Sequence, residues 1–220
     1  MPSVDTDEVR FQLRRAILRY ADAVSQPHRW LAEQDRWKEL VFAILTRAIP
    51  IREATVRVAV DTLGSLGLLN VSLLASDDAA ALQARHRALA VLAGEGFDQE
   101  QSDIAFRAMT EAAKGMQLHF QGKVQRYLRH YGELMLGQID DYFQFTDIPP
   151  PEVKDAFSYW LQNVASMPLP LHTEEVRRYC DQQGIDEKTL RAVADEIDIN
   201  FAFLDDIIAH EVLGLPATAE

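Results

Sequence analysis

The sequence predicts an all-α protein of about ten helices. Three observations lead to this prediction: apolar residues recur at helical spacing along most of the chain, strand patterns are weak, and prolines and glycines separate the periodic segments. Hydrophobic residues make up 48% and charged residues 25% of the 220 residues, which is an ordinary globular composition. A disordered chain is therefore excluded.

Amphipathic patterns define the expected helices. The apolar residues of the segments 37–48, 153–164 and 190–208 follow the i, i+3, i+4, i+7 spacing of a helix with one buried face. The segment 56–61 alternates like a strand, but it lies between helical patterns and we expect it to be helical. Asp98 (with Gln101 three residues later), Thr173 and Asp186 have the character of N-caps. Helices are expected over residues 6–25, 29–48, 52–66, 77–93, 98–117, 122–142, 150–165, 173–183, 187–197 and 199–213.

The charge is distributed unevenly. The formal net charge is −12, and residues 147–220 contribute −10 of it through 15 acidic and five basic side chains. Such a segment repels phosphates and attracts basic partners. It is therefore a solvated acidic surface, a docking face for a basic protein partner, or a part of the protein that avoids nucleic acid.

Several classes of protein are excluded or disfavoured. The longest apolar run, residues 40–45, is too short to span a membrane, and the first residues lack the order of a secretory signal. We therefore expect a cytoplasmic protein that does not enter a membrane. The single cysteine, Cys180, excludes an internal disulfide, a cysteine-ligated zinc site and a four-cysteine iron–sulfur cluster. Asp206 and His210 are spaced for one helix face but lack further ligands, so neither a metal nor another cofactor is expected.

The stretch from Ile148 to Cys180 contains a short turn, an amphipathic helix, a proline-rich connection and a second helix. This order resembles the core of the helix-hairpin-helix DNA glycosylase superfamily, the endonuclease III-like proteins. Ile148-Pro149 stands where that family has Leu-Pro, Lys154 stands at the hairpin lysine, and His172-Thr173 stands at the spacing of the catalytic Asp-Thr. The segments 37–49 and 122–136 resemble two earlier helices of the family, in the same order.

The resemblance implies a fold and a site. It implies one compact unit of two lobes, one of residues 30–145 and one of residues 1–29 and 146–220, with a degenerate hairpin at 148–154. It implies damaged DNA or a nucleoside-like ligand as partner. The residues that would serve catalysis are Lys154, His172, Glu174 and Glu175. The residues that would contact nucleic acid are Arg47, Lys123 and Arg126.

Two departures from the family pattern bear on activity. The hairpin glycines are replaced by Pro150, which has no N–H to donate, and by Glu152, which places negative charge where a phosphate would lie. The catalytic aspartate is replaced by His172, which cannot supply negative charge. We therefore expect a divergent glycosylase-like protein whose N-glycosylase activity is lost or altered.

Two other interpretations stay open. The first is an active but atypical glycosylase or lyase, in which Lys154 is the nucleophile and Glu174 or Glu175 replaces the missing aspartate. The second is an acidic helical protein-interaction module. Each proposed site residue also has a structural interpretation: Lys154 as an exposed lysine between acids, His172 as a loop histidine, and Cys180 and the aromatic residues near the hairpin as core.

Overall fold

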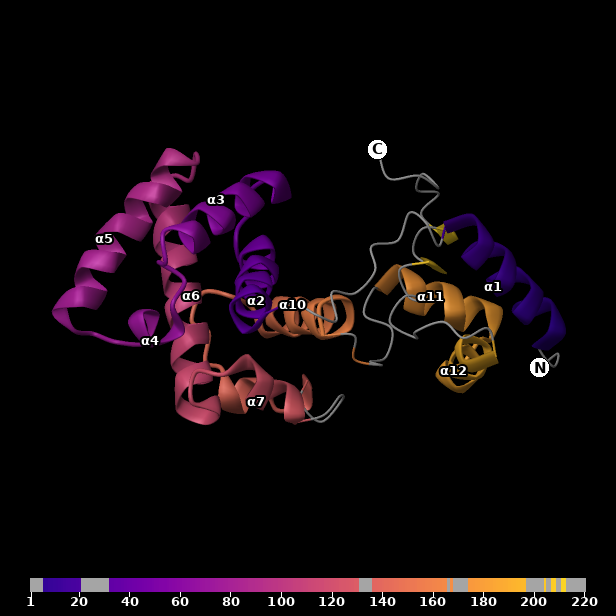
Figure 1. Ribbon diagram of the computed structural model, residues 1–220. Coiled ribbons are helices and arrows are strands. Elements are labelled where there is room, and N and C mark those ends of the chain that lie inside the picture. The colour runs from indigo at the N-terminus through magenta and orange to yellow at the C-terminus, as the bar shows by residue number, and fades with distance from the viewer. Residues whose placement is uncertain are drawn as a thin grey trace. The chain divides into compact units, whose positions relative to one another are not determined.

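The computed structural model describes residues 6–20, 32–130, 136–165, 167 and 174–196, and five positions between 204 and 212 (Figure 1). Every regular element in these residues is an α-helix, so the predicted all-α class is confirmed. The chain divides into two units. We call residues 30–160 the central unit, and residues 1–29 with 161–220 the terminal unit.

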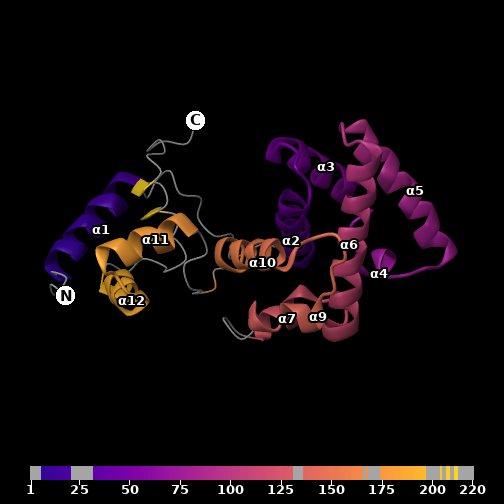
Figure 2. The same ribbon diagram turned by 180° about the vertical axis from the view of Figure 1, so that it is seen from behind.

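The central unit is built around one long helix. Its helices are α2 (Glu33–Ala48), α3 (Glu53–Ser65), α4 (Val71–Leu74), α5 (Ala79–Gly94), α6 (Gln99–Phe120), α7 (Val124–Arg129), α9 (Ile139–Tyr142) and α10 (Pro150–Asn163), of which α10 runs three residues past the unit's end. Helix α6 contacts α2, α4, α5, α7 and α9. Figures 1 and 2 both show α5 beside one half of α6, and α7 at its other end. The two ends of α6 therefore support different surfaces.

Local sequence signals explain several helix starts. The Asp98 carboxylate accepts from the Gln101 N–H at 2.8 Å and the Gln101 side chain accepts from the Asp98 N–H at 3.0 Å, so the predicted capping box of α6 is confirmed. The side chains of Asp78 and Asn70 cap α5 and α4 with one hydrogen bond each, and neither cap was predicted. The predicted single helix over 122–142 is wrong, because α7 ends at Arg129 and His130 has an extended backbone.

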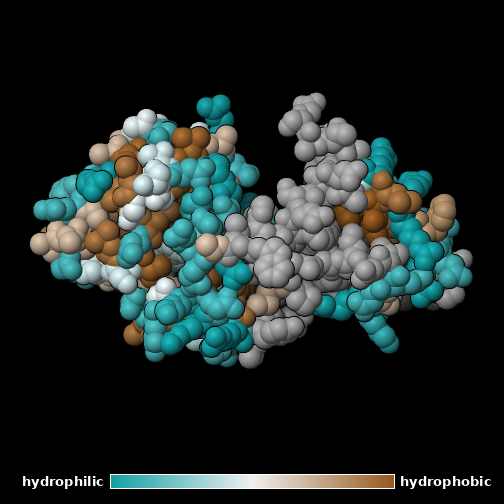
Figure 3. All heavy atoms as spheres, viewed as in Figure 1, coloured by the Kyte–Doolittle hydropathy of each residue, from teal (hydrophilic) through white to brown (hydrophobic). Residues whose placement is uncertain are grey.

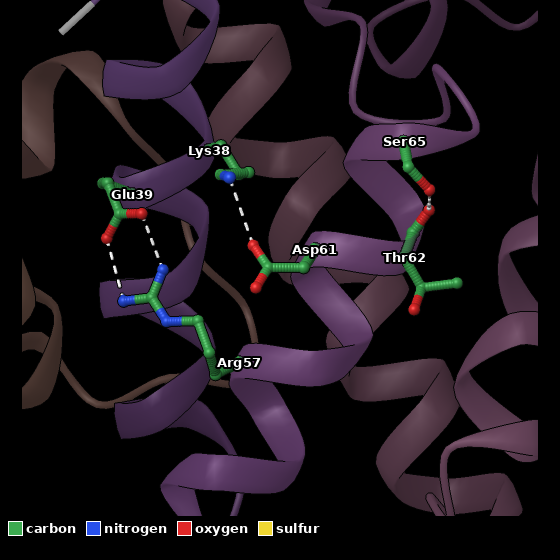
Figure 4. A network of polar contacts seen from close by, with 6 residues as sticks. All are labelled: Lys38, Glu39, Arg57, Asp61, Thr62 and Ser65. Carbon is green, nitrogen blue, oxygen red and sulfur yellow. Dashed lines mark hydrogen bonds and ion pairs between the residues drawn. The ribbon is translucent and has the colours of Figure 1, made fainter.

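Helices α2 and α3 are joined by polar pairs at the surface (Figure 4). The Arg57 guanidinium donates to both carboxylate oxygens of Glu39, at 2.6 and 2.9 Å, and Lys38 Nζ lies 3.1 Å from Asp61. Arg57 also lies over the Phe42 ring, 3.5 Å from its centre. Burial alone would lower the pKa of Arg57, but the hydrogen bond and charge of Glu39 outweigh burial and raise it. These cations are therefore engaged within the fold.

An aromatic cluster forms the core between α6, α7 and α10. The Tyr127 ring lies 5.1 Å from Phe120, 5.6 Å from Phe143, and 5.8 Å from both Phe157 and Trp160. Tyr127 is fully buried, and this burial raises the pKa of its hydroxyl. Because Tyr127, Phe143 and Trp160 are buried side chains in van der Waals contact, they act as core residues rather than as the lining of a base pocket.

The same cluster explains where the central unit ends. We expected the lobe boundary near residue 145, with the hairpin 148–154 in the lobe that contains the termini. The structure instead has the boundary after Trp160. Val153, Phe157 and Trp160 of α10 are buried, and Trp160 Nε1 donates to the Arg36 carbonyl at 2.9 Å. This burial fixes the start of α10 in the central unit.

The terminal unit joins both ends of the sequence. Its helices are α1 (Thr6–Tyr20), α11 (Glu174–Gln183) and α12 (Glu187–Glu196). Its main core contains Cys180, in agreement with the prediction of a packed cysteine, together with Leu13, Ile185, Leu190, Val193, Ala194, Leu204 and Ile208. Asp186 caps α12 through the Thr189 N–H at 2.7 Å, as predicted. The predicted cap at Thr173 lies outside the described residues.

Ion pairs connect α1 with the acidic C-terminal segment. Glu196 pairs with Arg10 and Arg14, and Glu211 pairs with Arg15 at 3.3 Å and with Arg19 at 3.7 Å. Two of the acidic residues that give this segment its charge are thus neutralised by the chain's own arginines.

Candidate nucleic-acid interface

The degenerate hairpin ends in an ordinary helix start with few free donors. Ile148 is buried, and the Val153 N–H donates to the Pro149 carbonyl at 3.1 Å, which closes the first turn of α10. The first two residues of α10, Pro150 and Pro151, have no N–H. A helix normally leaves four N–H groups available at this end, where they could bind a phosphate. At the start of α10 these four positions are residues 149–152, of which three are prolines without an N–H and the fourth is Glu152.

Lys154 forms an ion pair within the central unit. Its Nζ lies 3.1 Å from the Asp140 carboxylate, and 43% of its side chain is exposed. An imine-forming lysine must bring its Nζ to the substrate, and the Lys154 Nζ is already engaged by the Asp140 carboxylate. The surroundings of Lys154 therefore favour a structural lysine over a nucleophile.

Arg47 is occupied in a similar way. Its Nε lies 2.8 Å from the carboxylate of Asp155, the residue next to Lys154 in α10. Both predicted cations of this region are thus paired with acids of the same unit. Binding a phosphate here would require one or both of these ion pairs to open.

The remaining predicted catalytic residues are not in the central unit. His172 lies outside the described residues. Glu174 and Glu175 are the first two residues of α11 in the terminal unit, and only their backbone is described. Lys154 belongs to the central unit. The predicted catalytic set is therefore divided between the two units of the chain.

The outer face of α7 carries the predicted nucleic-acid cations Lys123 and Arg126. Val124 and Tyr127 are the buried residues of this short helix, whereas Lys123, Arg126 and Arg129 are exposed. In the part of the chain that the structure describes, none of these three cations forms an ion pair. We call Lys123, Arg126 and Arg129 the α7 basic face. Sequence reasoning missed Arg129, although its spacing of three residues from Arg126 is the signal for a shared helix face.

The position of α7 is fixed by its neighbours. The chain leaves α6 through Gln121 and Gly122, both with positive φ, and this turn starts α7 at once. The Glu33 carboxylate of α2 accepts from the Gln125 N–H at 3.2 and 3.3 Å, and Arg36 donates to the Gln125 side chain. The basic face is thus held on a rigid support rather than on a free loop.

Aromatic and histidine rings flank α7, and three of them are exposed or half-buried. The Phe120 ring lies 5.6 Å from His130, which follows α7, and 5.3 Å from Tyr142 of α9. His119 lies 5.2 Å from Tyr142. His119 and His130 are exposed and Tyr142 is half-buried. Cations beside accessible rings are the combination on which single-stranded nucleic acids bind, by phosphate attraction and base stacking.

The described residues lack two other features, a metal-ion site and a membrane-spanning helix. These residues contain no group of three or more His, Cys, Asp or Glu side chains that could hold a metal ion. They also contain no helix that is both long and apolar enough to cross a membrane. A scan against protein-family models and searches of curated proteins and of solved structures found no match.

Proposed function

We propose that this protein is a divergent, glycosylase-like helical protein that binds nucleic acid through the α7 basic face and has no N-glycosylase or lyase activity. The observation that supports this proposal best is the contrast in cation pairing. Arg47 and Lys154 near the hairpin are ion-paired, whereas Lys123, Arg126 and Arg129 have no carboxylate partner among the described residues. When cations without a carboxylate partner neutralise phosphates, the counterions condensed on the nucleic acid are released. This release drives binding.

The expected affinity follows from the charges. The central unit contains 13 basic and 18 acidic residues, so long-range repulsion opposes a polyanion. Three phosphate contacts must overcome that repulsion. We expect sequence-independent binding with a Kd on the order of 10⁻⁴–10⁻⁶ M that weakens as salt is added. The single cysteine, Cys180, is buried in the core of the terminal unit, and a chain with no internal disulfide fits a reducing cytoplasm.

The lack of catalysis follows from the hairpin. The Lys154 Nζ is paired with Asp140, and the start of α10 offers neither glycine backbone nor a full set of N–H donors. The family's catalytic carboxylate is absent at position 172. Each of these features opposes a step of glycosylase or lyase chemistry: lesion docking, imine formation and charge stabilisation on the sugar.

The acidic interaction module receives less support. Asp147, Asp155, Glu196 and Glu211, all in the acidic segment, form ion pairs with arginines of this chain. A basic partner would have to compete with these internal pairs. We therefore favour the nucleic-acid proposal over a docking role for residues 147–220.

The binding part of the proposal is tested by fluorescence anisotropy with a labelled single strand and a labelled duplex at low salt. The variant Arg126→Gln with Arg129→Gln should lower affinity for both at least about tenfold. The matched control is Arg52→Gln with Arg87→Gln, which removes the same charge from exposed residues elsewhere in the central unit. If both variants lost affinity equally, the net charge of the protein would explain the loss. That result would overturn the assignment of the binding site to α7.

The catalytic part is tested separately by borohydride trapping on a duplex with an abasic site. We expect no covalent adduct with the wild-type chain, and none with Asp140→Asn, which removes the partner of Lys154. An adduct that disappears in Lys154→Ala would show that the protein is an active lyase. That result would contradict the catalytic part and leave the binding part standing.

A further inference from the structure

A second concave site lies along the middle of α6, where Phe106, Arg107 and Thr110 contribute to its lining. Helices α4, α5 and α6 enclose a cavity of about 240 Å³. Its apolar lining consists of Leu73, Leu74, Ala81, Leu82, Ala84 and Phe106. Leu82 is 55% exposed, so part of this apolar surface faces solvent. Figure 3 shows hydrophobic residues at the surface between hydrophilic ones in the region of α4 and α5.

Three cations line the same cavity, and they differ in their partners. Arg107 Nε lies 3.0 Å from Asp147, and Lys114 Nζ lies 3.7 Å from Asp77. The Arg85 guanidinium lies over the Phe106 ring, 5.4 Å from its centre. In the described part of the chain, no carboxylate pairs with Arg85. A guanidinium that stacks on a ring keeps its N–H donors available at the ring's edge.

We propose that this cavity binds a small amphiphilic carboxylate, with its hydrocarbon part against the leucines and its carboxylate on Arg85. The lining carboxylate Glu111 accepts from the Thr146 N–H and hydroxyl, at 3.1 and 2.7 Å. Arg85 is the lining cation that no described carboxylate pairs with, so it is the group that can hold an anion. The apolar walls select a hydrocarbon body. The volume lies below the roughly 300–1,000 Å³ of sites for drug-sized ligands, so one short chain or ring is the appropriate size. The site is independent of nucleic-acid binding at α7.

The test uses octanoate as the probe and ligand-observed NMR on the full chain. Octanol and octylamine serve as matched probes that have the same hydrocarbon body without the negative charge. Arg85→Gln should weaken octanoate binding about tenfold, because it removes the charged donor for the carboxylate, and should leave octanol binding unchanged. Arg87→Gln is the matched control, because it removes an exposed arginine of the same helix that does not line the cavity.

A cavity-filling variant provides a second test that does not depend on charge. Thr110 lines the cavity, and Thr110→Phe should abolish binding of both octanoate and octanol while α-helical circular dichroism stays as in the wild type. Tighter binding of octylamine than of octanoate would overturn the proposal. So would an equal effect of Arg85→Gln and Arg87→Gln, or octanoate binding that Thr110→Phe does not change.

Discussion

The starts of α7 and α10 both carry cations that the sequence resemblance links to nucleic acid or catalysis. In the structure they differ in whether carboxylates pair with those cations. Both follow a turn, and both bring a lysine to the beginning of a helix in the central unit. At α10 the prolines remove donors, and Asp140 pairs with Lys154. At α7 the Glu33 carboxylate of α2 accepts the Gln125 N–H, and Lys123, Arg126 and Arg129 extend into solvent.

The comparison teaches that the order of residues along a motif does not by itself carry its chemistry. The hairpin at 148–154 keeps the Ile-Pro and lysine positions of the family but not its free backbone donors. The α7 basic face has none of the hairpin's sequence pattern, but its cations are available. What distinguishes the two regions is whether neighbouring elements already satisfy the charges.

The largest expected effect is a loss of stability when the packing of α6 against α9 is disturbed. A Cβ at Gly115 of α6 would lie 2.5 Å from the Tyr142 carbonyl oxygen and 2.6 Å from the Phe143 ring. Gly115→Ala should therefore lower the free energy of unfolding by about 3 kcal/mol, the upper range for overpacking, in urea denaturation. Gly94→Ala is the control, because nothing lies within 4 Å of its added Cβ. A neutral Gly115→Ala would mean that α6 and α9 are not in such close contact.

A restored hairpin tests the comparison from the other side. Pro150→Gly with Glu152→Gly returns one N–H donor and removes one negative charge at the start of α10. We expect affinity for a labelled duplex to rise about tenfold at low salt, because each charge-assisted hydrogen bond contributes about 1.5–3 kcal/mol. Glu152→Gln, which removes the charge alone, should give a smaller gain. If neither variant bound the duplex more tightly than the wild-type chain, the hairpin segment 148–154 would not approach DNA at all.

The smallest expected effect is the loss of a helix cap. Unlike α7 and α10, helix α12 begins with a side-chain cap, which Asp186 provides. Hydrogen bonds from the side chain and then the backbone of Thr189 lower the pKa of Asp186. The Asp186 carboxyl binds a proton less readily in the folded state than in the unfolded state. The stability that this cap contributes is therefore fully present above the unfolded pKa of about 3.9, and it is lost as the pH falls through the lower pKa of the folded state.

Asp186→Ala should therefore lower the urea midpoint slightly at neutral pH, and its difference from the wild type should disappear in acid. Asp181→Ala is the control, because the Asp181 side chain is also exposed but makes no described cap. A difference that persists at acidic pH would rule out the cap as its cause.

Local patterns predicted those features that depend on residues close in sequence. The capping box of Asp98 and Gln101 spans three residues, and the apolar side of α11 indicated that Cys180 is buried. The end of α7 at Arg129 was not predictable in this way. Nothing in the apolar period breaks there. Tyr127 packs against Phe143, 16 positions further along the chain, and no local pattern reveals such a contact.

The charges of the candidate site depended on residues distant in sequence. Arg47 and Asp155 pair across 108 positions and Lys154 and Asp140 across 14, so no helix-spacing rule could reveal either pair. The sequence could identify which cations exist but not which of them are neutralised. For that reason Arg47 was predicted as a nucleic-acid contact although Asp155 neutralises it.

The central claim, that the α7 basic face binds the phosphate chain, is tested most directly by the salt dependence of duplex binding. For three phosphate contacts, the slope of log K against log salt concentration should be about −3 in the wild-type chain. In Arg126→Gln with Arg129→Gln the slope should shrink to about −1, whereas Arg52→Gln with Arg87→Gln should keep the wild-type slope. An unchanged slope in the α7 variant would contradict the account, because the cations that meet the phosphates would then lie elsewhere.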